Sequence, residues 1–248
     1  NSQGALDVAF LPGNGGMSAQ AIFNGCTNGS IKTLLIAGEN PVISYPGHAD
    51  VVKALEAVEF LAVTELFLSE TAQMADLVLP VCSYAEKEGT FTSTERRVQK
   101  VLPAIPPVGQ SRSEFKVYGE LIALLGGQAP TSVADVFTKI SAYNNINYAE
   151  LGEGGAFVAV EIKPAQIVPK TNLPTPEPGK LALLTGAALY HCGTMSLYGE
   201  GTVAVCGEAY VEVSRDDAAK LNITDGDTVK LNSATGTVTL KARISPRM

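Results

Sequence analysis

Residues 86–100, which read EKEGTFTSTERRVQK, are rich in charged side chains. The adjacent Arg96 and Arg97 suit the binding of phosphate or carboxylate, because a planar guanidinium can donate two parallel hydrogen bonds to one anion. Gly89 allows a tight bend in the same stretch. This combination indicates an anion-binding loop, and the alternative is a solvated charged loop without a ligand.

A second candidate is the turn Gly38-Glu39-Asn40-Pro41, which directly follows the apolar run TLLIA at residues 33–37. Backbone N–H groups at such a turn can face a phosphate, and Glu39 can accept hydrogen bonds from a ribose or from a guanine edge. An ordinary strand-to-helix turn has the same pattern, so the four residues alone do not decide between the two interpretations.

The apolar pattern predicts the elements that position these groups. Strands are predicted at residues 33–37, 60–63 and 77–79, and helices at 48–58 and at 69–75 behind a Ser69 cap. Apolar strands that alternate with helices indicate parallel crossovers and an open α/β sheet. Ligands of such sheets bind at the carboxyl ends of the strands. Both candidate segments follow a predicted strand.

Two more helices are predicted before a change in composition. The pattern Ser111-x-x-Glu114 is typical of a capping box and predicts a helix that ends at Gly126-Gly127. One apolar face predicts another helix at residues 133–143. Residues 163–180 are rich in proline, which favours an extended linker.

The chain after this linker has a β-rich pattern. Strands are predicted at residues 181–184 and 210–213, with a short helix at 216–221 capped by Ser214. Residues 228–231 are predicted to pair with residues 237–244, whose apolar side chains alternate with polar ones. A small β-barrel fits this pattern, so we expect domains at 1–162 and 181–248 joined by the linker.

Residues 86–99 closely resemble the signature E-K-x-G-T-F-x-N-x-E-R-R-V-Q of the molybdopterin oxidoreductase superfamily, with Ser93 in place of the usual Asn. This superfamily includes formate dehydrogenases, nitrate reductases and the large G subunit of bacterial NADH:quinone oxidoreductase. It carries G-x-N-P at the place of residues 38–41, in the α/β domain that holds one guanosine half of a bis(molybdopterin guanine dinucleotide) cofactor. The resemblance extends to Glu70-Thr71 beside Asp76.

Residues 185–194, TGAALYHCGT, are similar to the superfamily motif T-G-R-x-x-x-H-x-x-T, which offers donors to pterin and phosphate. Ala187 stands at the motif's Arg position, which removes a cationic partner. His191 would be a neutral hydrogen-bonding group there, and the alternative is a loop histidine without a ligand. The resemblance implies a Rossmann-like parallel-sheet domain followed by a small double-psi β-barrel of the molybdopterin dinucleotide-binding type, cut short at Met248.

The resemblance implies cofactor binding at positions in all three segments. They are Gly38, Glu39, Asn40, Pro41, Glu70, Thr71, Asp76, Gly89, Thr90, Glu95, Arg96, Arg97, Thr185, Gly186, His191 and Thr194. It implies no catalytic residue and no metal ligand here, because the superfamily's cysteine-ligated iron–sulfur cluster and its metal ligand lie upstream. The cofactor itself, molybdopterin guanine dinucleotide, is either retained or lost.

Composition excludes several other classes. The net charge of −7 and the pI near 4.9 leave no basic stripe for nucleic acid. No apolar stretch approaches the roughly 20 residues that span a bilayer, so we expect no direct membrane insertion. The four cysteines are scattered without a C-x-x-C pair, which favours reduced thiols in a cytoplasmic protein.

Three functions follow from the resemblance. The opening NSQGALD and the segment around residues 77–99 are most similar to the G subunits, which implies a carboxyl-terminal fragment of NADH:quinone oxidoreductase. Its partners would then be other subunits of a respiratory complex, on the cytoplasmic side of the inner membrane, and the fragment alone would catalyse nothing. The alternatives are a fragment of a molybdenum or tungsten formate dehydrogenase-like enzyme and a purely structural assembly module.

Overall fold

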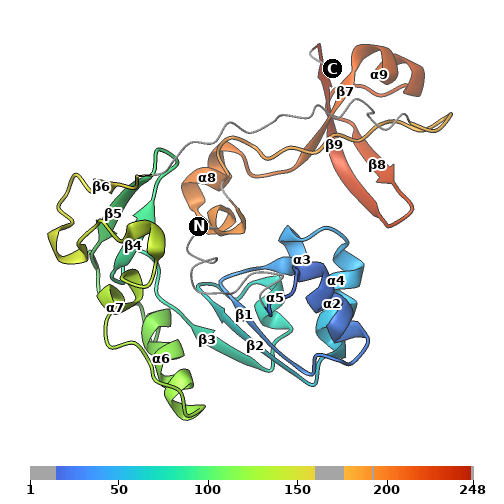
Figure 1. The fold of residues 1–248 in the computed structure, drawn as a ribbon. Coiled ribbons are helices and arrows are strands. Elements are labelled where there is room, and N and C mark those ends of the chain that lie inside the picture. The colour runs from blue at the N-terminus through green and yellow to red at the C-terminus, as the bar shows by residue number, and fades with distance from the viewer. Residues whose placement is uncertain (1–14, 160–175, 192, 247–248) are drawn as a thin grey trace. The chain divides into compact units, whose positions relative to one another are not determined.

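The computed structural model describes residues 15–159, 176–191 and 193–246. The chain divides into two compact units, Asn1–Thr171 and Asn172–Met248, and each is described by itself. Figure 1 shows the elements of both units. Most of the predicted linker at 163–180 lies outside the described residues.

The first unit contains a parallel three-stranded sheet, as predicted. Its strands are β1 (Thr33–Ala37), β2 (Phe60–Glu65) and β3 (Leu77–Pro80), in the order β1-β2-β3. Both pairings are parallel. The carboxyl ends of the strands therefore form one edge, where the predicted Gly38–Pro41 turn begins.

Helices connect these strands and supply the core of the sheet. They are α2 (Ala19–Thr27), α3 (Pro41–Ser44), α4 (His48–Ala57) and α5 (Glu70–Gln73). The α4 helix and the Ser69 cap of α5 were predicted, whereas α2 was not. Buried side chains from α2, α4, α5 and β2 form one cluster, and they include Cys26, Val51, Leu55, Leu61 and Val63.

The charged stretch at residues 86–100 contributes to an antiparallel hairpin. Strands β4 (Gly89–Thr92) and β5 (Arg97–Val101) pair with each other, and the short β6 (Ala156–Phe157) pairs with β5. A second core underlies this sheet, in which Val98 packs with Phe137, Tyr148 and Leu151. The stretch is therefore a folded element rather than a solvated loop.

Two helix predictions need correction. Helix α6 (Glu114–Leu124) begins behind Ser113 rather than Ser111, and Ser113 makes no side-chain capping bond. Gly126 does end it, in the left-handed conformation at φ 78°. The predicted helix at 133–143 is interrupted, because α7 (Val133–Phe137) stops early and the 3₁₀ turns η1 (Ser141–Tyr143) and η2 (Tyr148–Glu150) follow. The capping box belongs to α7, between Ser132 and Asp135.

The second unit contains a three-stranded sheet in the order β7-β9-β8. Its elements are η3 (Thr194–Tyr198), α8 (Glu200–Val205), β7 (Tyr210–Ser214), α9 (Arg215–Leu221), β8 (Thr228–Asn232) and β9 (Thr237–Ser245). The predicted pairing of β8 with β9 and the Ser214 cap of α9 are confirmed. The predicted strand at 181–184 is wrong, because these residues are irregular and pair with no described strand.

None of the helices in the described parts of the chain is both long enough and apolar enough to span a membrane.

Candidate functional site

A closed hydrogen-bond network lies at the carboxyl edge of the parallel sheet. The Asn40 side-chain oxygen accepts hydrogen bonds from the Thr71 hydroxyl at 2.7 Å and from the Thr71 backbone N–H at 3.2 Å. The Asn40 side-chain nitrogen donates to the Glu70 carboxylate at 2.8 Å. The Thr71 hydroxyl in turn accepts from the Val42 N–H at 3.2 Å. The network therefore ties the turn after β1 to the start of α5.

The local sequence explains how these residues meet. Gly38 adopts φ 61°, which only glycine tolerates easily, and its N–H donates to the Thr64 carbonyl of β2 at 2.8 Å. Pro41 then starts α3, where a missing N–H costs nothing. Across the edge, the Ser69 hydroxyl caps α5 by accepting from the Ala72 N–H at 3.3 Å. Residues predicted from two separate motifs are thereby brought together.

Burial separates positioning residues from exposed residues at this edge. Asn40 is 4% exposed and Thr71 is fully buried, so their polar atoms serve each other. Glu39 is exposed, and its carboxylate has no hydrogen-bond or ion-pair partner within the described residues. Glu39 is consequently the side chain at this turn that a ligand could reach.

The structure places Asp76 at the opposite edge of the sheet. Its carboxylate accepts a hydrogen bond from the Leu61 N–H at 2.8 Å, at the beginning of β2. Because β2 and β3 are parallel, this contact lies at the amino ends of the strands, away from Asn40 and Thr71. Asp76 therefore anchors the start of two strands and does not belong with the carboxyl-edge residues.

The hairpin turn treats its two arginines differently. The Arg96 N–H donates to the Ser93 carbonyl and the Ser93 N–H donates to the Arg97 carbonyl, both at 2.9 Å, which places Arg96 at φ 66° in the left-handed region. The exposed Arg96 side chain has no partner within the described residues. Arg97 instead lies over the Phe157 ring, 5.0 Å from its centroid, with its Nε 3.1 Å from Glu95. The predicted pair of phosphate-binding arginines is thus split into one committed and one uncommitted side chain.

Three charged residues at the start of the signature hold loops together, a role that sequence reasoning missed. The first of them, Glu86, accepts from the Ser83 and Val108 N–H groups at 2.6 Å each. These hydrogen bonds, the Ser83 bond foremost, lower the pKa of Glu86 below its ordinary value. The signal that could have found this role is the spacing of three between Ser83 and Glu86, which is typical of a side chain that closes a turn.

The next two residues of the signature join the hairpin to helical segments. The Lys87 ammonium lies 2.5 Å from the Glu114 carboxylate at the start of α6. Glu88 accepts a hydrogen bond from the Tyr148 hydroxyl at 2.7 Å. Burial, together with this carboxylate, raises the pKa of Tyr148. Both contacts span long sequence distances, which no local pattern reveals.

A cavity of about 890 Å³ lies beside these clamps. Its walls come from the beginning of the hairpin, the start of α6 and the helix α7, with Phe115, Val136 and Ile140 among the apolar side chains. Of the cofactor-binding candidates, Thr90 lines it. The cavity therefore does not coincide with the Asn40 edge.

Nothing in the first unit joins the two predicted cofactor segments directly. Within residues 15–159, no hydrogen bond or ion pair connects the hairpin turn to the Asn40 edge. Gly89 begins β4, where an added Cβ would meet nothing within 4 Å. That the two segments share one ligand remains a prediction.

In the second unit, His191 has both ring nitrogens engaged. Nδ1 lies 3.0 Å from the Ser196 hydroxyl, and Nε2 contacts the Cys206 carbonyl, which can only accept a hydrogen bond. His191 therefore holds η3 and the end of α8 together. Thr194 begins η3, while Thr185 and Gly186 are exposed in an irregular segment.

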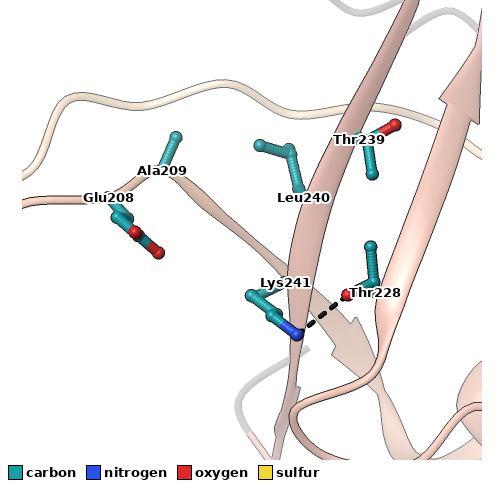
Figure 2. A pocket seen from close by; sticks show the side chains of 6 residues that line it. All are labelled: Glu208, Ala209, Thr228, Thr239, Leu240 and Lys241. Carbon is teal, nitrogen blue, oxygen red and sulfur yellow. Dashed lines mark hydrogen bonds between the residues drawn. The ribbon is translucent and has the colours of Figure 1, made fainter.

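A pocket of about 330 Å³ in this unit lies elsewhere. Figure 2 shows its lining, where the Lys241 ammonium donates a hydrogen bond to the Thr228 hydroxyl at 2.8 Å and Glu208 lies beside Ala209. Thr185, Gly186, His191 and Thr194 are not part of the lining. The predicted loop and this pocket are thus separate features.

These contacts test how well the residues fit a guanosine phosphate. Asn40, Thr71 and His191 do not fit as direct ligands, because their polar side-chain atoms are satisfied inside the protein. Arg97 is likewise engaged by Phe157. Glu39 and Arg96 do fit, as an exposed acceptor and an exposed cation. The described residues therefore match a cofactor only in part.

Family models match nearly the whole chain. Residues 1–124 match the molybdopterin oxidoreductase model, and residues 181–248 match the molydopterin dinucleotide binding domain. The chain belongs to the molybdopterin oxidoreductase family. This confirms the resemblance drawn from the signature at residues 86–99, and with it the predicted fold class of an α/β domain followed by a dinucleotide-binding-type domain.

Several curated relatives are similar over most of this chain. The second of the G subunits of NADH-quinone oxidoreductase in Rhizobium meliloti is 34% identical, over 96% of this chain and 29% of the relative. F420-dependent formate dehydrogenase subunit alpha of Methanocaldococcus jannaschii is 35% identical, over 87% of this chain and 37% of the relative. NADPH-Fe(3+) oxidoreductase subunit alpha of Geobacter sulfurreducens is 33% identical, over 96% and 28%. The chain thus spans about a third of the length of these oxidoreductase subunits.

A solved structure shares the fold. Acetylene hydratase from Pelobacter acetylenicus matches with a TM-score of 0.68 over 91% of this chain and 37% of that chain, at 12% identity. At that identity the match supports the architecture and carries no statement about activity.

Proposed function

We propose that this chain is the molybdopterin-type region of a G subunit of NADH:quinone oxidoreductase, in which it serves as a structural part. Its partners are then other subunits of a respiratory complex that holds it at the cytoplasmic face of the inner membrane. The chain alone catalyses no reaction, and iron–sulfur clusters belong to other parts of the subunit. The Rhizobium meliloti relative, 34% identical over 96% of the chain, supports this assignment.

The closed Asn40–Thr71–Glu70 network is the observation that carries the structural role. A site that needs its cofactor leaves polar groups poised for that cofactor, whereas here the buried amide and hydroxyl satisfy each other. Each buried group is paired without a ligand, so this edge is stable by itself. Ala187, at the place of the motif's Arg, also removes a cation that a phosphate would need.

A second candidate is a cofactor-holding subunit of the formate dehydrogenase type. Two observations favour it, namely the exposed Glu39 carboxylate and the exposed Arg96 guanidinium, neither of which has a partner in the described residues. A guanine edge and a phosphate are the chemical groups that such side chains bind. When bound, molybdopterin guanine dinucleotide would supply redox chemistry at a metal outside this chain. The Methanocaldococcus jannaschii relative is similar over 87% of the chain.

Titration of the chain with GDP by calorimetry separates the two candidates. The structural role predicts a Kd weaker than about 1 mM, and the same weak response to ADP. Micromolar GDP binding that is lost in both Glu39→Ala and Arg96→Ala supports the cofactor-holding role instead. Arg215→Ala, an exposed arginine of the second unit, is the matched control and should leave binding unchanged.

A further inference from the structure

The parallel sheet has its described helices on one face. The strand order β1-β2-β3 advances in one direction, and right-handed crossovers then place both connecting segments on the same side. The core agrees with this rule, because Val51 and Leu55 of α4 and Ala72 of α5 pack with Leu61 and Val63 of β2. Figure 1 shows α2, α4 and α5 grouped around β1 and β2. The topology therefore covers one face and leaves the other to a different part of the protein.

The opposite face carries an exposed apolar row. Side chains alternate along a strand, so the neighbours of Leu61 and Val63 point to the second face. The register aligns Leu35 with Ala62 and Ala62 with Leu77, across all three strands. Leu35, Leu77 and the nearby Phe60 are each 41% exposed. We call these three residues the open face.

Helix α6 covers only the other end of the second face. The Tyr118 hydroxyl lies 2.7 Å from the Thr64 hydroxyl, and Thr64 is fully buried. Thr64 aligns with Leu79, one row closer to the carboxyl edge than Leu77. The row at the amino ends therefore remains exposed. Exposed rows of this kind are unusual, because all-parallel sheets occur almost only with both faces covered.

We propose that the open face is a docking surface for an amphipathic helix from the additional polypeptide that the longer relatives possess. The chain spans 29% and 37% of two curated relatives and 37% of acetylene hydratase, so each of these proteins has most of its length outside the matched region. Helices are the elements that cover the second face of open parallel sheets. The surface offers aliphatic and aromatic contacts without a charged group, which suits the apolar stripe of such a helix. This inference rests on family membership and holds whether or not a cofactor is retained.

One substitution in two backgrounds tests the proposal. Phe60→Lys should change the melting temperature of the 248-residue chain by less than about 2 °C, and should lower that of the longest natural polypeptide containing it by at least about 5 °C. Leu184→Lys, at an 81% exposed site of the second unit, is the matched control and should be neutral in the 248-residue chain. Equal destabilisation in both backgrounds means that the chain covers its own face, and neutrality in both means that the face is solvated. Either result overturns the proposal.

Photo-crosslinking provides a readout that does not depend on the stability of the 248-residue chain. With p-benzoylphenylalanine at position 60 of the longest natural polypeptide, we expect crosslinks within the same chain to residues outside these 248. Crosslinks to the second unit, to a second copy or to another subunit contradict the proposal. So does a natural polypeptide without further residues.

Discussion

Removal of the Asn40 side chain tests the closed network most sharply. Asn40→Ala deletes three hydrogen bonds and leaves the fully buried Thr71 N–H and hydroxyl without their acceptor. A buried polar group that loses its partner costs about 1–3 kcal/mol. With partial rotation of the hydroxyl to another acceptor, we expect a loss of about 2–4 kcal/mol in the free energy of unfolding.

Chemical denaturation, with fluorescence and circular dichroism as independent probes, measures this loss. Glu39→Ala is the matched control one residue away, and should change stability by less than about 0.5 kcal/mol because Glu39 is exposed and unpaired in the described residues. A loss below about 0.5 kcal/mol for Asn40→Ala would refute the claim that the network stabilises this edge.

A charge exchange refines the same test. Asn40→Asp keeps the acceptor for Thr71 but places a second carboxylate against Glu70, where the amide nitrogen donated at 2.8 Å. The single variant should therefore be destabilised at neutral pH, and adding Glu70→Gln should restore most of the loss by supplying a new donor. Destabilisation that the second substitution does not relieve means that the two side chains do not meet as described.

Three further predictions concern the hairpin and its clamps. Arg96→Gly should stabilise the chain by about 0.5–1 kcal/mol because Arg96 has φ 66°, whereas Arg96→Ala should not; equal effects of the two substitutions would argue against backbone strain as the cause. Gly155→Ala should destabilise by more than about 2 kcal/mol, because its Cβ would lie 2.3 Å from the Val98 carbonyl oxygen at φ 64°; Gly154→Ala, with nothing within 4 Å, is the control, and similar losses in both would contradict the packing. The lowered pKa of Glu86 means that its carboxylate stabilises the fold above the ordinary value of 4.5, and that this contribution is lost as the pH falls through the lower folded value. The stability difference between the native chain and Glu86→Gln should therefore shrink between pH 7 and pH 3 in denaturation experiments, and a constant difference would count against this role.

Elements with a strong apolar period were predictable from the sequence. The runs at β1, β2 and β3 and the alternation along β9 each reflect burial that the fold requires, so their type and pairing were found. The hairpin of residues 89–101 was missed, because its strands mix charged and hydroxyl side chains, and only Val98 is fully buried. The α6 start was misplaced for a different reason, since Ser111 and Ser113 are equally good caps in local sequence.

The candidate site was predictable in position but not in state. Strand ends identify the Gly38–Pro41 turn and the Glu70-Thr71 pair as neighbours at one edge. Sequence alone does not reveal that Asn40 and Thr71 satisfy each other, or that Arg97 packs on Phe157 while Arg96 stays exposed. These facts depend on contacts across 31 and 60 positions of sequence, as in the Asn40–Thr71 and Glu88–Tyr148 pairs. Such distances lie beyond any local motif.

Metal analysis tests the proposed function most directly. The longest natural polypeptide containing this chain, purified under non-oxidising conditions, should hold molybdenum or tungsten at well below about 0.1 atom per chain by plasma mass spectrometry, with iron measured as the internal reference. That result is what a structural molybdopterin-type region predicts. Molybdenum or tungsten near one atom per chain, with guanine nucleotide released on denaturation, would contradict it.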